Sequence, residues 1–270
     1  TTLHNITPHT GDSWPFKLAT RLILGLSQKA IVHSRRNARQ LETELRQDPD
    51  NILILPMGAP DYRRGRKIDR AASRQHLGLP TERPILLMFG ALRDYKGLDV
   101  ALKALRSLID AVPQALLLVA GQAWLDRDEH DETVKRMGLT ANVRLDLDYI
   151  PDELIHHYFS AADLLLLPYL HFDAQSGVGV AALPYGLPAV VSDCGSLPEL
   201  VRDPGSVVRP SDAQQLATRI AEILGSPALH ARLAADATEL GRHHDWPSIA
   251  RDLSRQTNDL IAKQREGQKG

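Results

Sequence analysis

The 270-residue chain has little cysteine, little net charge and no long apolar run, and each scarcity excludes a class of protein. Its single cysteine, Cys194, excludes a disulfide framework and a cysteine-built zinc site, and it is typical of a reducing compartment. A formal net charge of −1 gives no general attraction to nucleic acid. No apolar run approaches the roughly 20 residues that cross a bilayer, and the first residues show no signal pattern. We therefore expect a cytoplasmic protein without nucleic-acid partners.

What the chain does have is a regular alternation of apolar and amphipathic segments. Residues 85–89, 115–120 and 163–167 are nearly continuous apolar runs, typical of strands that are covered on both faces. Segments with helical spacing lie between them, at residues 98–112 and 151–162. This alternation predicts an α/β fold with a doubly wound, Rossmann-like parallel sheet. Ligands of such a sheet bind at the carboxyl ends of the strands.

Two prolines, two glycines and a basic run in residues 56–67 indicate a linker, which we place at residues 59–67. The linker divides an N-terminal unit of residues 1–58 from a main domain of residues 68–245. A mostly helical segment, residues 246–270, is expected to follow. We interpret the basic run as a solvated hinge rather than a contact with lipid headgroups.

The first candidate site is the turn FGALRDYKG at residues 89–97, between a predicted strand and a predicted helix. Gly90 permits a close turn, and Arg93 and Lys96 place two cations beside the start of the helix. For this turn taken alone, solvated cations on the surface explain the pattern as well as a ligand site does. The turn also lacks the phosphate-loop spacing of nucleoside triphosphatases.

The second candidate site is the loop DAQSGV at residues 173–178, where small residues open a short helix. Free backbone N–H groups at such a position bind phosphate, so Ser176, Gly177 and Val178 are candidate donors. Asp173 is a candidate acceptor for sugar hydroxyls. An Asx-type turn that only caps the helix is the alternative. Cations from one turn and donors from another, at the same edge of a sheet, favour a phosphate site.

Other reactive side chains carry weaker signals. Asp146 and Asp148 have the Asp-x-Asp form of some metal sites, but two carboxylates are too few to identify one, so no metal is expected. Cys194 is interpreted as a small buried side chain, not a nucleophile. The pair His243 and His244 is expected in a linker before the final helix.

Three segments occur in order at residues 90–97 (GALRDYKG), 148–154 (DYIPDEL) and 173–199, a block that runs from a carboxylate through a helix to Pro198 and Glu199. Together they resemble the nucleotide-sugar-binding half of GT-B-fold glycosyltransferases, specifically the retaining family 4. The resemblance covers residues 85–199. It implies a GT-B-type fold with a partial second α/β domain.

The resemblance also implies an activity. An enzyme of this kind moves a hexose from a UDP- or GDP-linked sugar to a hydroxyl of a saccharide or lipid-linked acceptor, as in polysaccharide biosynthesis, without a metal or other cofactor. The diphosphate contacts fall on Arg93, Lys96 and the backbone of residues 176–178, the hexose contact on Asp173, and the base contact on the backbone near Tyr149. The residues assigned to the site are, for catalysis, His4, Arg93, Lys96 and Asp173, and, for donor binding, Gly90, Arg93, Lys96, Tyr149, Ile150, Gln175, Ser176, Gly177 and Val178.

The chain departs from the family pattern at three positions. Ala181 stands where a second glutamate grips the donor ribose, which leaves the base undecided. Ala91 replaces the usual arginine, and Arg93 is expected to take its place. Pro184 interrupts the short helix and removes a backbone donor, so we expect the helix to kink or end near Leu183.

Residues 1–55 resemble only the last third of the family's acceptor-side domain. We therefore expect a fragment, a truncated form or half of a split enzyme whose missing domain is a separate chain. The segment 246–270 is expected to return to the N-terminal part. The start of the chain resembles a strand-end histidine loop that approaches the donor, which makes His4 the N-terminal site candidate.

Two other functions stay open. One is a non-catalytic nucleotide-sugar-binding module, or a subunit of a split enzyme. The other is a sugar-nucleotide epimerase on the same fold. A peripheral location at the inner face of a membrane also stays open, because the acceptor can be lipid-linked.

Overall fold

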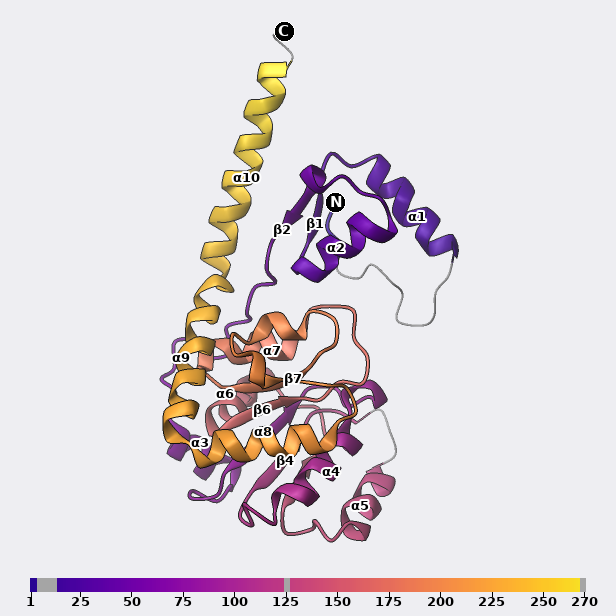
Figure 1. Cartoon of the computed structure of the whole chain (residues 1–270). Coiled ribbons are helices and arrows are strands. Elements are labelled where there is room, and N and C mark those ends of the chain that lie inside the picture. Colours follow the sequence, from indigo (N-terminus) through magenta and orange to yellow (C-terminus); the bar gives the residue numbers. More distant parts are fainter. Residues whose placement is uncertain (4–13, 124–126, 268–270) are drawn as a thin grey trace.

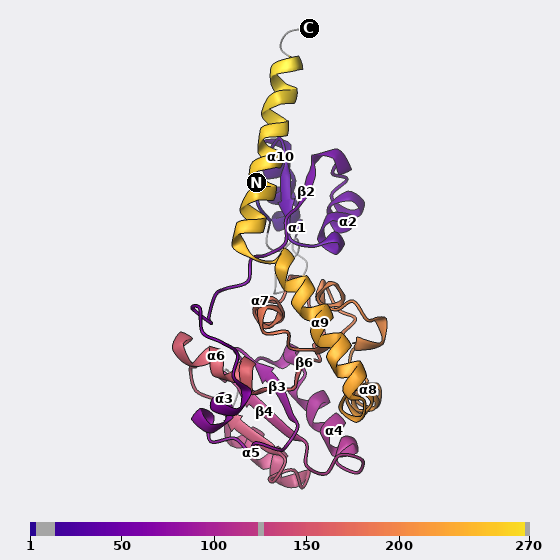
Figure 2. The same cartoon turned by 90° about the vertical axis from the view of Figure 1, so that its left-hand side faces the viewer.

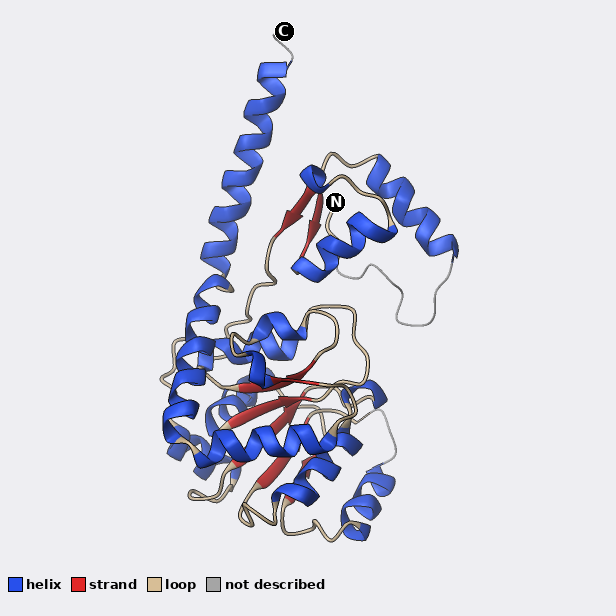
Figure 3. Ribbon diagram, viewed as in Figure 1, coloured by secondary structure: helices blue, strands red, loops and turns tan. Residues whose placement is uncertain are grey.

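The computed structural model describes residues 1–3, 14–123 and 127–267. Its main unit is a parallel sheet of six strands in the order β5–β4–β3–β6–β7–β8. The strands are β3 Ile85–Phe89, β4 Leu116–Ala120, β5 Val143–Asp146, β6 Leu164–Leu167, β7 Ala189–Ser192 and β8 Val207–Val208. The order reverses between β3 and β6, the switch point at which such sheets bind ligands. Helices lie on both sides of the sheet (Figure 3). The expected α/β fold with a doubly wound parallel sheet is confirmed.

The central strands are apolar on both faces because each face packs against helices. All residues of β4 and of β6 are buried. Alternate residues of β3 enter opposite cores: Leu87 packs with Val180 of one core, and Leu86 packs with Leu105 and Ile220 of the other. The helices are α3 Arg70–Leu77, α6 Asp152–Ala161 and α7 Gly177–Ala182 for the first core, and α4 Leu98–Leu108, α5 Arg127–Arg136 and α8 Ala213–Gly225 for the second.

One helix, α3, has no counterpart among the sequence-based expectations. Its residues lack an apolar stripe, and it is held in place by polar contacts. Asp69 caps its first turn, and the buried Arg74 pairs with Asp163 at 2.6 Å. Because buried ion pairs leave no hydrophobic periodicity, the pattern of the sequence did not reveal this helix.

The N-terminal unit is a small α/β unit of its own, drawn in indigo and violet in Figure 1. It contains α1 Trp14–Gly25, β1 Ala30–Val32, α2 Arg35–Glu44 and β2 Ile52–Ile54, and β1 pairs with β2 in parallel. Ser34 caps α2 as expected, by accepting a hydrogen bond from the Asn37 amide. This unit is a second α/β unit, as the family resemblance implies.

The C-terminal helices are α9 Pro227–His243 and α10 Trp246–Gly267, and α10 extends away from the six-stranded unit in both views (Figures 1 and 2). The expectation that His243 and His244 lie in a linker is wrong for His243, whereas His244 lies in the connection between α9 and α10. His243 ends α9, and His244 is buried, with its Nδ1 2.8 Å from the Met57 carbonyl oxygen. None of the described helices has the length and apolar character needed to cross a membrane.

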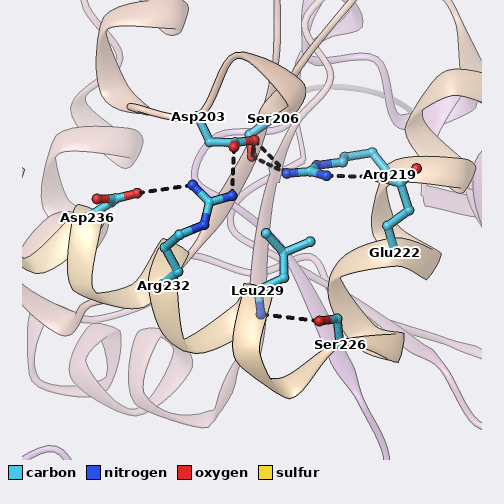
Figure 4. A network of polar contacts seen from close by, with 8 residues as sticks. All are labelled: Asp203, Ser206, Arg219, Glu222, Ser226, Leu229, Arg232 and Asp236. Atoms are coloured by element: carbon cyan, nitrogen blue, oxygen red, sulfur yellow. Dashed lines mark hydrogen bonds and ion pairs between the residues drawn. The ribbon is translucent and has the colours of Figure 1, made fainter.

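A charged network joins the segment before β8 to α8 and α9 (Figure 4). Asp203 precedes β8, and its carboxylate contacts Arg219 of α8 and Arg232 of α9. Ser206 donates to the same carboxylate at 3.2 Å. Burial raises the pKa of Asp203, but the hydrogen bond from Arg232 and the charge of Arg219 outweigh burial and hold this pKa below its usual range.

We expect Asp203→Asn to lower the free energy of unfolding by about 3 kcal/mol at pH 7, because Arg219 loses the charge that compensates it. The stabilisation is present above about pH 4, the pKa of an unfolded aspartate, and is lost as the pH falls through the lower folded-state pKa. Urea unfolding at pH 7 and near pH 3 measures both effects. The matched control is Asp252→Asn at an exposed ion pair. Equal losses for the two variants at pH 7 would contradict this account of the network.

Candidate functional site

The turns that follow β3 and β6 are in direct contact at the switch point. Gly97, with φ +70°, lies so close to the end of β6 that an added Cβ would meet the Pro168 carbonyl oxygen at 2.1 Å. The Leu170 amide donates to the Tyr95 carbonyl oxygen at 2.8 Å. The turn at residues 89–97 therefore lies against the segment that leads from β6 toward the loop at residues 173–178.

Lys96 is a buried cation within this edge. It is 6% exposed, and its ammonium donates to the Phe89 carbonyl oxygen at 2.9 Å and lies 5.8 Å from the Tyr169 ring centroid. No carboxylate pairs with it in the described part of the chain. Burial, and then the charge of Arg93, lower the pKa of Lys96 from 10.5 to about 8. A buried ammonium without an anion is costly, and it marks this position as one that an anionic ligand would complete.

Lys96 reaches the start of α7 across Gly90. A Cβ at Gly90, whose φ is +88°, would stand 3.0 Å from Lys96 Nζ and 3.0 Å from a Val178 methyl group. Only a residue without a side chain leaves this gap open, so glycine here keeps the ammonium and the first turn of α7 next to each other. The structure thus brings together Gly90, Lys96 and Val178, three of the predicted site residues.

The first turn of α7 has amides available to a ligand. Ser176 is the N-cap, and its hydroxyl accepts from the Gly179 amide at 3.2 Å. The amides of Gly177 and Val178 occupy the first two helical positions, which have no acceptor within the helix. The helix ends at Ala182 and continues as a 3-10 turn over Leu183–Tyr185, so the early end that Pro184 predicts is confirmed.

The loop before α7 is anchored by the N-terminal unit and the linker. The Asp173 carbonyl oxygen accepts from the Asn37 side chain at 3.0 Å, and the Gln175 side chain accepts from the Met57 amide at 3.0 Å. Glu199 accepts from the amides of Arg35 and Arg36, at 3.1 Å each, at the start of α2. Gln175 therefore positions the loop. Asp173 is exposed, and its role as a hexose contact stays a prediction.

Residues 69–240 match the family model for glycosyl transferases group 1. The chain belongs to this family. Among its relatives, D-inositol 3-phosphate glycosyltransferase of Corynebacterium glutamicum is 27% identical over 265 residues, which cover 94% of this chain and 63% of the relative. The enzyme of the same description from Segniliparus rotundus is 30% identical and covered to 51% of its length. The chain thus spans half to two thirds of these relatives.

Solved structures share the fold at low sequence identity. HepE of Anabaena in complex with UDP superposes with a TM-score of 0.83 at 20% identity, over 96% of this chain and 71% of that one. Sucrose-phosphate synthase of Thermosynechococcus elongatus gives 0.77 at 22% identity, over 97% and 67% of the two chains.

The other predicted site residues of this group 1 chain are described by their exposure and their neighbours. Tyr149 is 68% exposed in the loop after β5, and Ile150 is half-buried against the core. Arg93 is exposed and lies close enough to Lys96 to lower its pKa. His4 lies outside the described residues. Ala181 is buried in the core, so no carboxylate replaces the family's second glutamate there.

The Asp-x-Asp segment serves the structure. Asp146 accepts two hydrogen bonds from Arg144, at 2.8 and 3.0 Å, and one from the Tyr158 hydroxyl at 2.9 Å. Within the described ranges no group of three metal-ligating side chains occurs. Cys194 is buried as expected, and burial raises the pKa of its thiol, which opposes a nucleophilic role.

Sequence reasoning missed Asn37 and Glu199. Glu199 ends the block of residues 173–199 that resembles the family pattern, which was the available signal. Its partner is the start of a helix more than 160 residues earlier in the chain, and no local pattern encodes that pairing.

Proposed function

We propose that the chain is the donor-binding part of a retaining glycosyltransferase. It would move a hexose from a nucleotide diphosphate sugar to a hydroxyl of a saccharide or lipid-linked acceptor. The observation that carries this proposal is Lys96, a buried ammonium without a carboxylate partner among the described residues, beside the open amides of Gly177 and Val178. A diphosphate supplies the missing anion.

The proposed chemistry is electrostatic. Cleavage of the sugar–phosphate bond leaves negative charge on the departing diphosphate, and preorganised donors lower the barrier most where that charge develops. Lys96 is held by the Phe89 carbonyl and needs no rearrangement to meet the charge, and Arg93 adds a second cation at the mouth of the site. We assign no protein nucleophile.

We propose UDP as the nucleotide. Support comes from HepE, which is described in complex with UDP, with UDP and glucose, and with UDP-glucose. The backbone near Tyr149 and Ile150 is the proposed base contact, and Asp173 the proposed hexose contact. Because Ala181 supplies no ribose acceptor, the preference for UDP over GDP is the part of the proposal that most needs a test.

The test is a calorimetric titration with UDP, GDP and ADP, run beside a turnover assay with UDP-glucose. We expect UDP to bind at one site and more tightly than ADP. Turnover that requires an added saccharide acceptor supports the transferase, whereas binding without turnover favours the binding-module alternative. Mass spectrometry without an acceptor detects an epimerised sugar, the product that the epimerase alternative predicts. Failure of all three nucleotides to bind overturns the proposal.

A further inference from the structure

The loop at residues 173–178, called the donor loop below, has two halves that are held by different parts of the molecule. Its second half, residues 176–178, is held from within the main unit. Ser176 is 2% exposed, and its hydroxyl accepts from the Gly179 amide at 3.2 Å. A Cβ at Gly179 would meet the Leu200 side chain at 2.3 Å, so the first turn of α7 packs closely against the segment that follows β7. The main unit therefore shapes the half that faces the diphosphate.

The first half of the donor loop, residues 173–175, is held largely from outside the main unit. Asn37 of α2 donates from its side-chain Nδ2 to the Asp173 carbonyl oxygen at 3.0 Å. The Met57 amide, in the segment that leads into the linker, donates to the Gln175 side chain at 3.0 Å. This half carries Asp173, the predicted hexose contact.

The contact from Asn37 is the one that sets the direction of the Asp173 side chain. Ser196 of the main unit donates from its hydroxyl to the Ala174 carbonyl oxygen at 2.7 Å, which fixes the next residue of the loop. The carbonyl oxygen of Asp173 itself is held by Asn37. The orientation of that carbonyl fixes ψ of Asp173, and with it the direction in which the carboxylate leaves the loop.

Asn37 is held in the orientation that this contact requires. It is the third residue of α2 and is 3% exposed, and the N-cap Ser34 is fully buried. The Ser34 hydroxyl accepts from the Asn37 amide at 3.0 Å and donates to the Asn37 side-chain oxygen at 2.5 Å. With its oxygen held by Ser34, the side-chain amide of Asn37 turns its nitrogen toward Asp173.

The start of α2 is in turn anchored on the main unit. The two oxygens of Glu199 accept from the amides of Arg35 and Arg36, at 3.1 Å each. The first amides of a helix have no acceptor within it and lie at the positive end of its dipole, so a carboxylate there is stabilising. The N-terminal unit lies over the side of the main unit that carries α7 (Figures 1 and 2). Asn37 thus has a defined place above the donor loop.

We propose that Asn37 is a positioning residue for the hexose of the donor. It holds the Asp173 backbone so that the Asp173 carboxylate meets the sugar, and it takes no part in binding the diphosphate. Recognition of the hexose then depends on a residue of the N-terminal unit that does not touch the substrate. This inference rests on the proposed donor site.

Calorimetry with UDP, UDP-glucose and UDP-galactose tests the inference, because the hexose makes the difference between the ligands. We expect the wild type to bind at least one UDP-hexose about tenfold tighter than UDP, the scale of hydrogen bonds to a charged group. In Asn37→Asp this advantage is expected to fall to about twofold or less, while UDP binds within about twofold of the wild type. Aspartate keeps the size, an acceptor for Ser34 and a favourable charge at the helix start, but it presents oxygen to the Asp173 carbonyl.

Asn142→Asp is the matched control. The Asn142 side chain also donates to backbone carbonyl oxygens, those of Pro113 and Ala115 at 2.9 and 2.8 Å. It lies just before β5, at the amino ends of the strands, whereas the donor site lies at their carboxyl ends. We expect this variant to bind UDP and the UDP-hexoses as the wild type does. A second variant, Ser34→Ala, releases the Asn37 side chain without changing it, and it should lower the UDP-hexose advantage while UDP binding persists.

A double-mutant cycle separates positioning from support of the fold. Asp173→Asn is expected to lower the UDP-hexose advantage by itself, and adding Asn37→Asp to it should cause no further loss. Equal losses of affinity for UDP and UDP-hexose in Asn37→Asp, additive losses in the double variant, or a wild type that binds neither UDP-hexose more tightly than UDP would each overturn the inference. Failure of the wild type to bind UDP at all would instead overturn the donor site itself.

Discussion

Lys96→Met is expected to abolish transfer and to weaken nucleoside diphosphate binding by about 100-fold or more, because it removes the buried cation that the diphosphate meets. The same substitution is expected to stabilise the free protein. The fall of the Lys96 pKa from 10.5 to about 8 corresponds to about 3 kcal/mol of cost for the charged form at neutral pH, and methionine avoids this cost.

The opposite signs of the two effects separate a binding role from a structural one. If Lys96 only supported the fold, its replacement would lower the stability of the protein. Nucleotide binding would then fall together with that stability. The stability gain of the variant over the wild type should shrink as the pH rises from about 8 to 10.5, because the wild-type lysine becomes neutral over this range. Lys103→Met, at an exposed lysine of α4, is the control and should change neither quantity. Titration calorimetry and urea unfolding measure the two effects.

Gly97→Ala is expected to lower the free energy of unfolding by about 3 kcal/mol or more and to reduce diphosphate binding in the protein that remains folded. The glycine has φ +70°, and an added Cβ would lie 2.1 Å from the Pro168 carbonyl oxygen. The turn that carries Lys96 would therefore have to move away from the end of β6.

Gly78→Ala is the matched control for this substitution. Gly78 has φ +62°, but nothing lies within 4 Å of its added Cβ, so the variant reports the backbone cost alone, about 1 kcal/mol. Urea unfolding of both variants isolates the cost of the close approach between the two turns. Equal losses at Gly78 and Gly97 would show that this approach does not hold the site together.

The sequence was sufficient to predict the strands of the sheet, because whether a segment forms a buried strand depends on local properties. Buried parallel strands are apolar on both faces, so β3, β4 and β6 were predicted to within one residue of their observed ends. The turn containing Lys96 and the loop before α7 were found because glycine and small residues mark where strands end. Their convergence followed from the rule that ligands bind at the carboxyl ends of parallel strands.

The remaining features depend on contacts between distant residues, which no local pattern records. Glu199 caps α2, and Arg74 anchors α3 through Asp163. The burial of Lys96 belongs to this class as well. The sequence indicated a cation at a turn, and only the structure shows that it is enclosed without an anion among the described residues.

Proton uptake on UDP binding tests the central claim most directly. Calorimetry at pH 8 in two buffers of different ionisation enthalpy counts the protons bound with the nucleotide. Since the pKa of Lys96 is about 8, roughly half of the free protein carries a neutral lysine, and a bound diphosphate restores its charge. We predict an uptake of about half a proton per UDP in the wild type and none in Lys96→Arg, which stays charged. Absence of uptake in the wild type, or equal uptake in Lys96→Arg, would contradict the assignment of Lys96 to the diphosphate.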